Sequence, residues 1–381
     1  MKEPRRIESS ADHPSFRPES GNENNRLIAG NFFPTLPTVE PVFPILLRPI
    51  LTFYPKTREV GGFSAGFLLY YERQPDEGVT LYEECTMNPY VLSCCSTADL
   101  TKEHFEKRDI RYICFHYSVN GVAYPDDLGQ TMSYDEFYRH IRDLAETKTW
   151  QVNADEYERY FEEFLREGKD IVHLTLSSGI SGSYNSAVIA KNVLQEKYPD
   201  RKIYVVDSLA ASSGYGLLMD KLADLRDEGY SAEMLAEWAE RNKLKVHHWF
   251  YSTDLTYYVK GGRISKIAGW VGTILKLCPL LNCSNEGKLV PRQKLRGRAR
   301  ALEETRKKME ELAEDGTDYS GKCYICHSDC AEEAAKLKAE VEQTFPHLNG
   351  EVEIYSIGTT IGCHTGVGTI ALFFWGEERT N

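Results

Sequence analysis

The sequence predicts an α/β fold with two α/β domains, a parallel-sheet N-terminal domain and a mixed-sheet C-terminal domain, with a cleft between them. After residue 87, short apolar runs alternate with amphipathic segments of roughly 10–15 residues, which is typical of strands and helices around a parallel sheet. The rhythm changes near residue 244. The 381 residues are 41% hydrophobic and 27% charged, enough to bury sizeable cores. We therefore expect domains at 87–243 and 244–381.

The N-terminal domain is expected to alternate strands with helices. Thr101 should cap a helix that begins at Lys102, and Gly168 should end a later one, because hydroxyl side chains and glycine favour those positions. The predicted strands lie at 90–100 (a short strand running into a polar turn), 111–118, 170–176 and 202–207, and the further helices at 133–146, 155–167, 186–197 and 217–227.

The C-terminal domain is less regular. Strands are predicted at 247–252, 289–294, 322–326, 351–355 and 371–375, a glycine-rich helical stretch at 264–278, and charged helices at 300–314 and 331–344. The glycine-rich stretch 358–368 is expected to be a loop.

Residues 1–86 have a different composition and are predicted to be loop. They hold ten of the 16 prolines, and each proline removes a backbone donor and disfavours helix at the preceding residue. Two interpretations stay open. The segment is a flexible N-terminal extension, or an over-extended gene start, since Glu83-Glu84 is compatible with the codons GAGGAG, a ribosome-binding sequence shortly before Met87. An intact mass of the native protein equal to that of all 381 residues would contradict the second interpretation.

Charge and hydropathy argue against several classes of protein. A net charge of −12 disfavours broad nucleic-acid binding, which needs basic surface. No apolar run reaches the ~20 residues of a membrane-spanning helix, so no stable membrane insertion is expected. Ten scattered cysteines without a secretory signal indicate reduced thiols and a cytoplasmic location.

Some motifs have residue types suited to binding. The turn 177–183 (SSGISGS) follows a predicted strand and precedes a helix, so its N–H groups could meet a phosphate or carboxylate, or it is only a tight capped turn. Arg263 follows two glycines and suits a carboxylate or a surface ion pair, and His364 lies among glycines that allow close approach to a ligand. Cys323, Cys326, His327 and Cys330 match haem or zinc spacing, but the two cysteines should lie on opposite strand faces, and we expect no metal.

Residues 88–377 resemble the DegV family, the fatty-acid-binding proteins of bacterial fatty acid kinases. Several motifs carry the resemblance in one order: Ser96-Thr-Ala-Asp-Leu100, Leu176-Ser-Ser-Gly-Ile-Ser-Gly-Ser-Tyr184, Asp207-Ser208, Lys260-Gly-Gly-Arg-Ile264, Pro279-Leu-Leu281, Lys294-Leu-Arg296 and Ile361-Gly-Cys-His-Thr-Gly-Val-Gly368.

The resemblance implies a lipid site between the two domains and no catalysis by this chain alone. It implies no cofactor, but a bound long-chain fatty acid such as palmitate or oleate, presented to an ATP-dependent fatty acid kinase subunit that makes the acyl phosphate. Its carboxylate ligands map to Thr149, Ser178, Arg263 and His364. The kinase contact maps to Arg296, within a basic cluster at 292–300.

Two positions depart from the family pattern. Cys95 stands where the family has aspartate, and Trp150, which follows Thr149, stands where it has serine. Trp150 either narrows the head-group region or packs at the surface. Two other functions stay open: a lipid carrier without a kinase, and a hydrolase or phosphotransferase with Ser178 as nucleophile and His364 as base.

Overall fold

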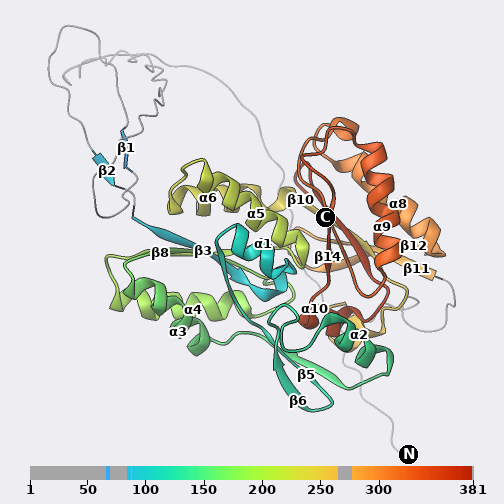
Figure 1. The fold of residues 1–381 in the computed structure, drawn as a ribbon, viewed down its shortest axis with the longest axis horizontal. Coiled ribbons are helices and arrows are strands. Elements are labelled where there is room, and N and C mark those ends of the chain that lie inside the picture. Colours follow the sequence, from blue (N-terminus) through green and yellow to red (C-terminus); the bar gives the residue numbers. More distant parts are fainter. Residues whose placement is uncertain (1–65, 69–83, 87, 265–276, 380–381) are drawn as a thin grey trace, which may run out of the picture. The chain divides into compact units, whose positions relative to one another are not determined.

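A four-stranded parallel sheet forms the first half of the fold (Figure 1). The computed structural model describes residues 66–68, 84–86, 88–264 and 277–379. The sheet has the order β4-β3-β8-β9, with strands Ile110–Ile113, Tyr90–Cys95, Asp170–Thr175 and Ile203–Asp207. Every residue of β8 is buried, as the apolar run predicted.

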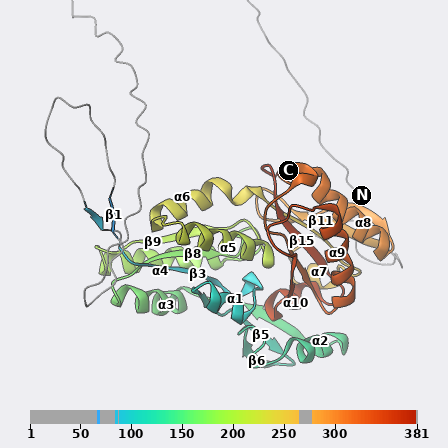
Figure 2. The ribbon, with the colours of Figure 1, turned by 45° about the horizontal axis from the view of Figure 1, so that its top comes forward.

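Helices cover both faces of this sheet. Figure 2 shows α3 (Ala154–Arg166) and α4 (Ser183–Lys197) on one face, and α5 (Ser213–Asp227) and α6 (Ala232–Asn242) on the other. α1 (Lys102–Lys107) is capped by Thr101, whose hydroxyl accepts from the N–H of His104, as predicted. α6 was not predicted, although Ser231 caps it.

The predicted strand 111–118 is wrong, because the chain leaves the parallel sheet at Cys114 and forms a second strand elsewhere. The N–H of Phe115 donates to Ser96 Oγ at this bend. β5 (His116–Val119) then pairs antiparallel with β6 (Val122–Pro125) and β7 (Thr147–Trp150) in a small sheet of order β6-β5-β7.

α2 (Tyr134–Arg142) packs on this small sheet. Ser133 caps it, as predicted. It ends at Arg142 instead of 146, because Leu144 adopts a left-handed backbone with φ 58°.

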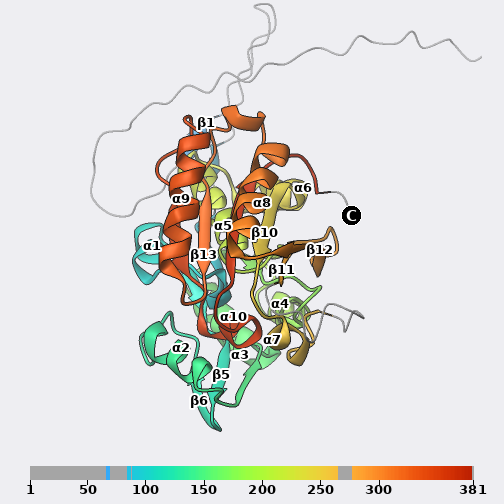
Figure 3. The ribbon, with the colours of Figure 1, turned by 90° about the vertical axis from the view of Figure 1, so that its right-hand side faces the viewer.

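The second half of the fold is a six-stranded mixed sheet, β12-β11-β10-β15-β13-β14, as predicted (Figure 3). Its only parallel pair is β13–β14, among the strands that the structure describes. The strands are β10 (Val246–Tyr251), β11 (Leu277–Cys283), β12 (Leu289–Arg296), β13 (Tyr324–His327), β14 (Glu353–Ser356) and β15 (Ile370–Trp375).

α8 (Arg298–Leu312) and α9 (Ala331–Thr344) cover one face of the mixed sheet. α9 has the predicted bounds. The predicted glycine-rich helix 264–278 lies largely outside the described residues, and its last two positions, from Leu277, begin β11.

α5 packs between the two sheets. It contacts β3 on one side and β10, β13 and β15 on the other, and most of its residues are buried. Buried residues of both sheets therefore form one continuous hydrophobic cluster around it. The predicted boundary at 243/244 falls in the turn Lys243–Lys245 and stays a prediction.

Two short elements complete the part that positions the site. α7 (Thr256–Lys260) precedes the glycines of the Lys260–Ile264 motif. α10 (Thr359–Thr365) contains His364, so the prediction of a loop at 358–368 is wrong over these residues. α10 packs against α7, α2, β5 and β7, and it thus joins the C-terminal half to the small sheet.

The stretch 1–86 was predicted to be loop, and the part of it that is described contains two short strands. β1 (Gly66–Leu68) pairs antiparallel with β2 (Glu84–Thr86). Among the described helices, none combines the length and the apolar character needed to cross a membrane.

Candidate functional site

Thr149 and His364 meet where β7 and α10 pack together. Thr149 Oγ1 lies 2.7 Å from His364 Nε2, within hydrogen-bond distance. Across the histidine, the Cα of Gly261 lies so near Nδ1 that a side chain at Gly261 would collide with the ring. The glycine after α7 therefore makes room for the imidazole.

Burial keeps His364 neutral. Desolvation, with a smaller contribution from the positive charge of Arg263, lowers the pKa of His364 from 6.5 to about 4. Nδ1 has no hydrogen-bond partner in the described part of the chain. A neutral imidazole next to a hydroxyl can offer a hydrogen bond to an anion without placing a second cation beside Arg263.

Arg263 connects the end of α7 to the turn before α4. Its Nε donates to the carbonyl of Ile180 at 3.1 Å, and Nη1 donates to the carbonyl of Gly261 at 2.6 Å. The side chain is partly buried, and this burial lowers the pKa of Arg263 from its usual value. Its second terminal nitrogen, Nη2, has no hydrogen bond or ion pair within the described ranges and can serve a ligand carboxylate.

The turn 177–183 is a strand-to-helix connection, as predicted. Ser177 is buried and donates to the carbonyl of Gly287, while Ser178 is exposed and its N–H donates to Asp207 Oδ1 at 3.0 Å. Ser181 donates to Gln151 Oε1 at 3.3 Å. The structure thus brings Thr149, Arg263 and His364 to one cavity, and Ser181 is the one serine of the turn that lines it.

These residues line one end of a cavity of about 270 Å³ between the two halves of the fold. Ser178 does not line it. Its walls come from β7, the turn, α7 and α10, and comprise Phe115, Thr149, Trp150, Gln151, Leu176, Ile180, Ser181, Ala211, Tyr258, Arg263, Leu289, Thr360, Ile361, His364 and Thr365. Sequence reasoning missed Gln151 and Ser181 as lining residues, and only the position of Ser181 in the strand-to-helix turn 177–183 could have indicated it.

A second, mainly apolar cavity of about 50 Å³ adjoins the first. The two share Ala211, Tyr258, Leu289, Ile361 and Thr365. Beyond these, the second cavity reaches Phe250, Cys326, Ile357 and Phe373, which lie between α5 and the mixed sheet. The combined space is polar at the Thr149 end and apolar at the other.

Of the two departures from the family pattern, Trp150 lines the first cavity and Cys95 lines neither cavity. Trp150 stacks on His116, its cross-strand neighbour, with ring centroids 5.7 Å apart. The indole also lines the cavity beside Thr149, and Trp150 is 43% exposed. Cys95 is buried, and its thiol lies 3.0 Å from the hydroxyl of Tyr157.

Arg296, the predicted kinase contact, is the last residue of β12, an edge strand of the mixed sheet. It is exposed, and it has no hydrogen bond or ion pair with another described residue. Its neighbours Arg298 and Arg300 are paired with Glu333 and Glu303.

The cysteine motif has no metal-binding geometry. Cys323 packs in the cluster under α8 and α9, whereas Cys326 packs in the cluster around α5, on the other face of the sheet. No group of three or more potential ligands converges on one point among the described residues.

Comparison with known proteins places most of this chain in one family. The family model described as "Uncharacterised protein, DegV family" matches residues 95–377. A DegV domain-containing protein of Clostridium perfringens is 34% identical over 293 residues, 77% of this chain and 99% of that protein.

Solved structures share the fold. A stearic-acid-binding protein of Eubacterium ventriosum has 28% identity and a TM-score of 0.67, over 76% of this chain and 99% of that one. The Fatty Acid Kinase (Fak) B3 protein of Streptococcus pneumoniae, loaded with linoleic acid, has 25% identity and a TM-score of 0.66, over 76% and 100%. The family match and the curated relative show that this chain belongs to the DegV family.

Proposed function

We propose that this chain binds a long-chain fatty acid between its two halves and presents the carboxylate to a partner kinase. The observation that carries this proposal is the polarity of the cavity, in which Thr149, Arg263 and His364 converge at one end and mainly apolar side chains line the rest. A molecule with one anionic end and a long apolar chain fits that arrangement.

The carboxylate is held by complementary groups. The Thr149 hydroxyl, which accepts from Nε2–H of the neutral His364 ring, keeps its own proton for a hydrogen bond to the carboxylate, and Nη2 of Arg263, which has no partner among the described residues, offers a charge-assisted one. Each buried methylene of the chain adds about 0.8 kcal/mol. Ser178 stays a proposed ligand on the resemblance alone, and Ser181 is the hydroxyl of the same turn that lines the cavity.

Presentation to a kinase assigns the chemistry to the partner. The kinase would transfer the terminal phosphoryl group of ATP to the carboxylate, and this chain would supply binding and orientation only. The similarity to the Fatty Acid Kinase (Fak) B3 protein of Streptococcus pneumoniae supports this role. Arg296, which is exposed and has no ion pair with a described residue, is the proposed contact.

A hydrolase or phosphotransferase in the same cleft is less well supported. That mechanism needs Ser178 beside His364, but no hydrogen bond joins them in the part of the chain that the structure describes, and Ser178 is exposed. A carrier without a kinase partner would bind the acid but would not support its phosphorylation by a kinase, and this difference can be measured.

Native mass spectrometry of the gently purified protein, followed by titration with oleate, tests fatty acid binding. We expect to find an acid bound to the purified protein or saturable binding of oleate at one site. The absence of both would contradict the proposal. Phosphorylation of the bound acid by the kinase subunit of the same organism and ATP then tests presentation. Arg296→Ala should abolish it and leave oleate binding unchanged, whereas Arg241→Ala, an exposed arginine on α6, should change neither. Turnover of a substrate by this chain without a kinase would favour the hydrolase or phosphotransferase.

A further inference from the structure

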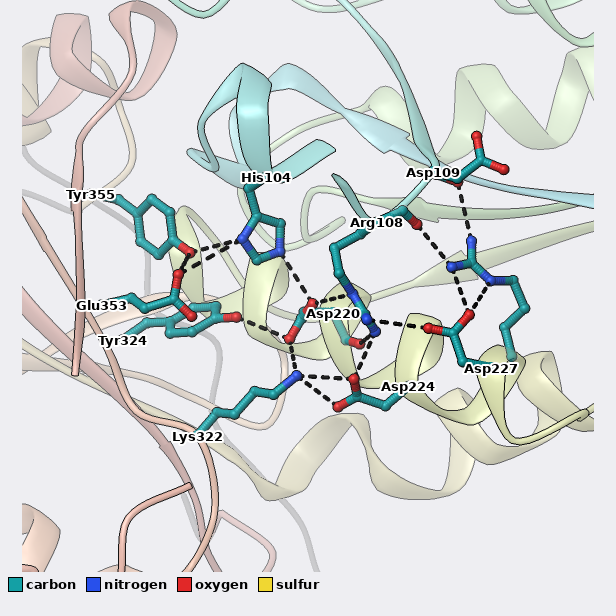
Figure 4. A network of polar contacts seen from close by, with 11 residues as sticks. His104, Arg108, Asp109, Asp220, Asp224, Asp227, Lys322, Tyr324, Glu353 and Tyr355 are labelled. Atoms are coloured by element: carbon teal, nitrogen blue, oxygen red, sulfur yellow. Dashed lines mark hydrogen bonds and ion pairs between the residues drawn. The ribbon is translucent and has the colours of Figure 1, made fainter. Parts of the chain in front are cut away.

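A network of charged side chains around a buried carboxylate joins three elements that also form the wall of the cavity (Figure 4). Its centre is Asp220 on α5, whose side chain is 2% exposed. Asp220 accepts from Tyr324 of β13 at 3.0 Å and from Lys322 at 2.5 Å, and it lies 2.9 Å from Arg108 Nε. His104 of α1 links this centre to β14.

The hydrogen bonds around His104 require a proton on each ring nitrogen. Nε2 lies 3.1 Å from Asp220 Oδ1, a carboxylate oxygen that only accepts. Nδ1 lies 3.0 Å from the hydroxyl of Tyr355, which donates its single proton to Glu353 Oε2 at 2.6 Å. The Tyr355 oxygen therefore accepts from Nδ1–H. A neutral His104 would leave one of these contacts without a proton.

The charges around the ring agree with an imidazolium. Facing His104 are Asp220 from α5, Tyr324 from β13, Glu353 and Tyr355 from β14, and Arg108 from its own helix segment. Around them, the cations are Arg108, Arg226 and Lys322, and the carboxylates are Asp220, Asp224, Asp227 and Glu353. With a proton on His104, the network has four positive and four negative charges.

Burial lowers the pKa of His104, but its hydrogen bond to Asp220 and the negative charges of Asp220 and Glu353 outweigh this, so the net pKa is raised above 6.5. Because the folded-state pKa is raised, the stabilisation is complete below about 6.5 and is lost as the pH rises through the higher folded value.

Three elements connect the network to the cavity. α5 carries Asp220, and Ala211 and Ser212 just before it line the cavities. β13 carries Tyr324 and, two residues later, Cys326 of the apolar cavity. β14 carries Tyr355 and is followed by Ile357, which also lines that cavity, and then by α10 with His364. A change in how β14 is held against α1 and α5 thus acts directly on the walls around the ligand.

We infer that His104 is a pH-controlled clamp: protonated, it ties α1 and α5 to β14 and retains the bound acid, and on losing its proton it releases β14 and speeds ligand exit. The retention and release of the acid rest on the proposed fatty acid binding. The tie between α1, α5 and β14 concerns the fold alone and is measured without ligand.

The test compares the full chain with His104→Gln, Glu353→Gln and a control, His347→Gln, which changes an exposed histidine after α9. Two quantities are measured from pH 6.0 to 8.5: the urea midpoint of the ligand-free protein, and the rate at which bound oleate is released to excess serum albumin. For the unmodified chain and the control we expect a falling midpoint and a release rate that rises at least about tenfold, the effect of losing one hydrogen bond to a charged group.

His104→Gln should make both profiles flat, with release as fast at pH 6.0 as the unmodified chain shows at pH 8.5. Glu353→Gln changes a half-exposed side chain. It should lower the pH at which the urea midpoint falls and the release rate rises, because a neutral amide stabilises the imidazolium less. A merely structural role would not change this pH.

Profiles of His104→Gln that match the unmodified chain would overturn the clamp. A flat midpoint with an unchanged release profile would overturn its connection to the cavity. If the unmodified chain binds no oleate, the proposed function fails, and the urea midpoints still decide the clamp. Should His104→Gln not fold, the pH shift in Glu353→Gln decides in the same way.

Discussion

The hydroxyl of Thr149 lies 2.7 Å from Nε2 of His364, and this contact joins residues 215 positions apart. Thr149 comes from a small sheet inserted in the first half of the chain, and His364 from a helix near its end. The polar end of the cavity therefore exists only when the two halves pack together.

Replacing Thr149 by Val should weaken oleate binding about tenfold. The substitution removes the hydroxyl, with little change of shape, from a site where it serves both the ligand and His364. Isothermal titration at neutral pH measures the effect. Thr149→Ser retains the hydroxyl and should bind within a few-fold of the unmodified chain. Equal affinity of the Val and Ser variants for oleate would show that the hydroxyl at position 149 does not contribute to binding.

The buried His364 should make the ligand-free protein less stable in acid. Its pKa is lowered from 6.5 to about 4, so the unfolded chain binds a proton more readily. The contribution to the free energy of unfolding is complete above pH 6.5 and is lost as the pH falls toward 4, by up to about 3 kcal/mol. Urea unfolding at pH 7 and 4.5 should show a smaller loss in His364→Gln. Identical losses in both proteins would contradict the lowered pKa.

Arg263→Lys should weaken oleate binding about tenfold, although the charge is retained. A lysine cannot hold the carbonyls of Ile180 and Gly261 while it contacts a carboxylate, because it lacks the planar guanidinium. Lys260→Ala removes an exposed cation at the end of α7 and serves as the control. If both variants bind alike, Arg263 acts only through long-range charge.

The parallel sheet was predictable because its strands are short apolar runs bounded by polar turns. α9 has the predicted bounds because its alanine-, glutamate- and lysine-rich run ends just before Pro346. By contrast, β7 has four residues with partly polar side chains, and nothing local distinguishes it from a loop.

α10 shows why the site itself could not be predicted from local pattern. Its sequence contains Gly362, which disfavours helix, but a side chain there would come within 2.6 Å of the Phe137 ring. Tertiary packing thus selects both the glycine and the helix. The Thr149–His364 contact is equally non-local, and only the resemblance to the DegV family identified the pair from sequence.

Gly179→Ala should destabilise the protein by roughly 1–3 kcal/mol and weaken oleate binding. A methyl group at Gly179 would lie 2.7 Å from the backbone oxygen of Gly287 and nearer still to that of Glu286, and neither can rotate away. Ile180 and Ser181, which line the cavity, would shift with the turn. Urea unfolding and oleate titration measure the two effects.

The matched control is Gly182→Ala in the same turn, where the added methyl group meets only the flexible end of Gln151. Its loss of stability should be clearly smaller. Equal losses would indicate that the turn is intolerant of any side chain, and the close approach to Gly287 would not be the cause.

Ser181→Ala should weaken oleate binding by about threefold to tenfold, the usual effect of one hydroxyl, and Ser178→Ala should change it little. Ser181 lines the cavity and donates to Gln151, whereas Ser178 is exposed and only its backbone N–H is engaged, with Asp207. Titration of both variants under identical conditions compares them directly. The resemblance assigns the contact to Ser178 instead. A larger loss in Ser178→Ala would therefore mean that the turn 177–183 rearranges when the acid binds, turning Ser178 inward and breaking the contact between its N–H and Asp207.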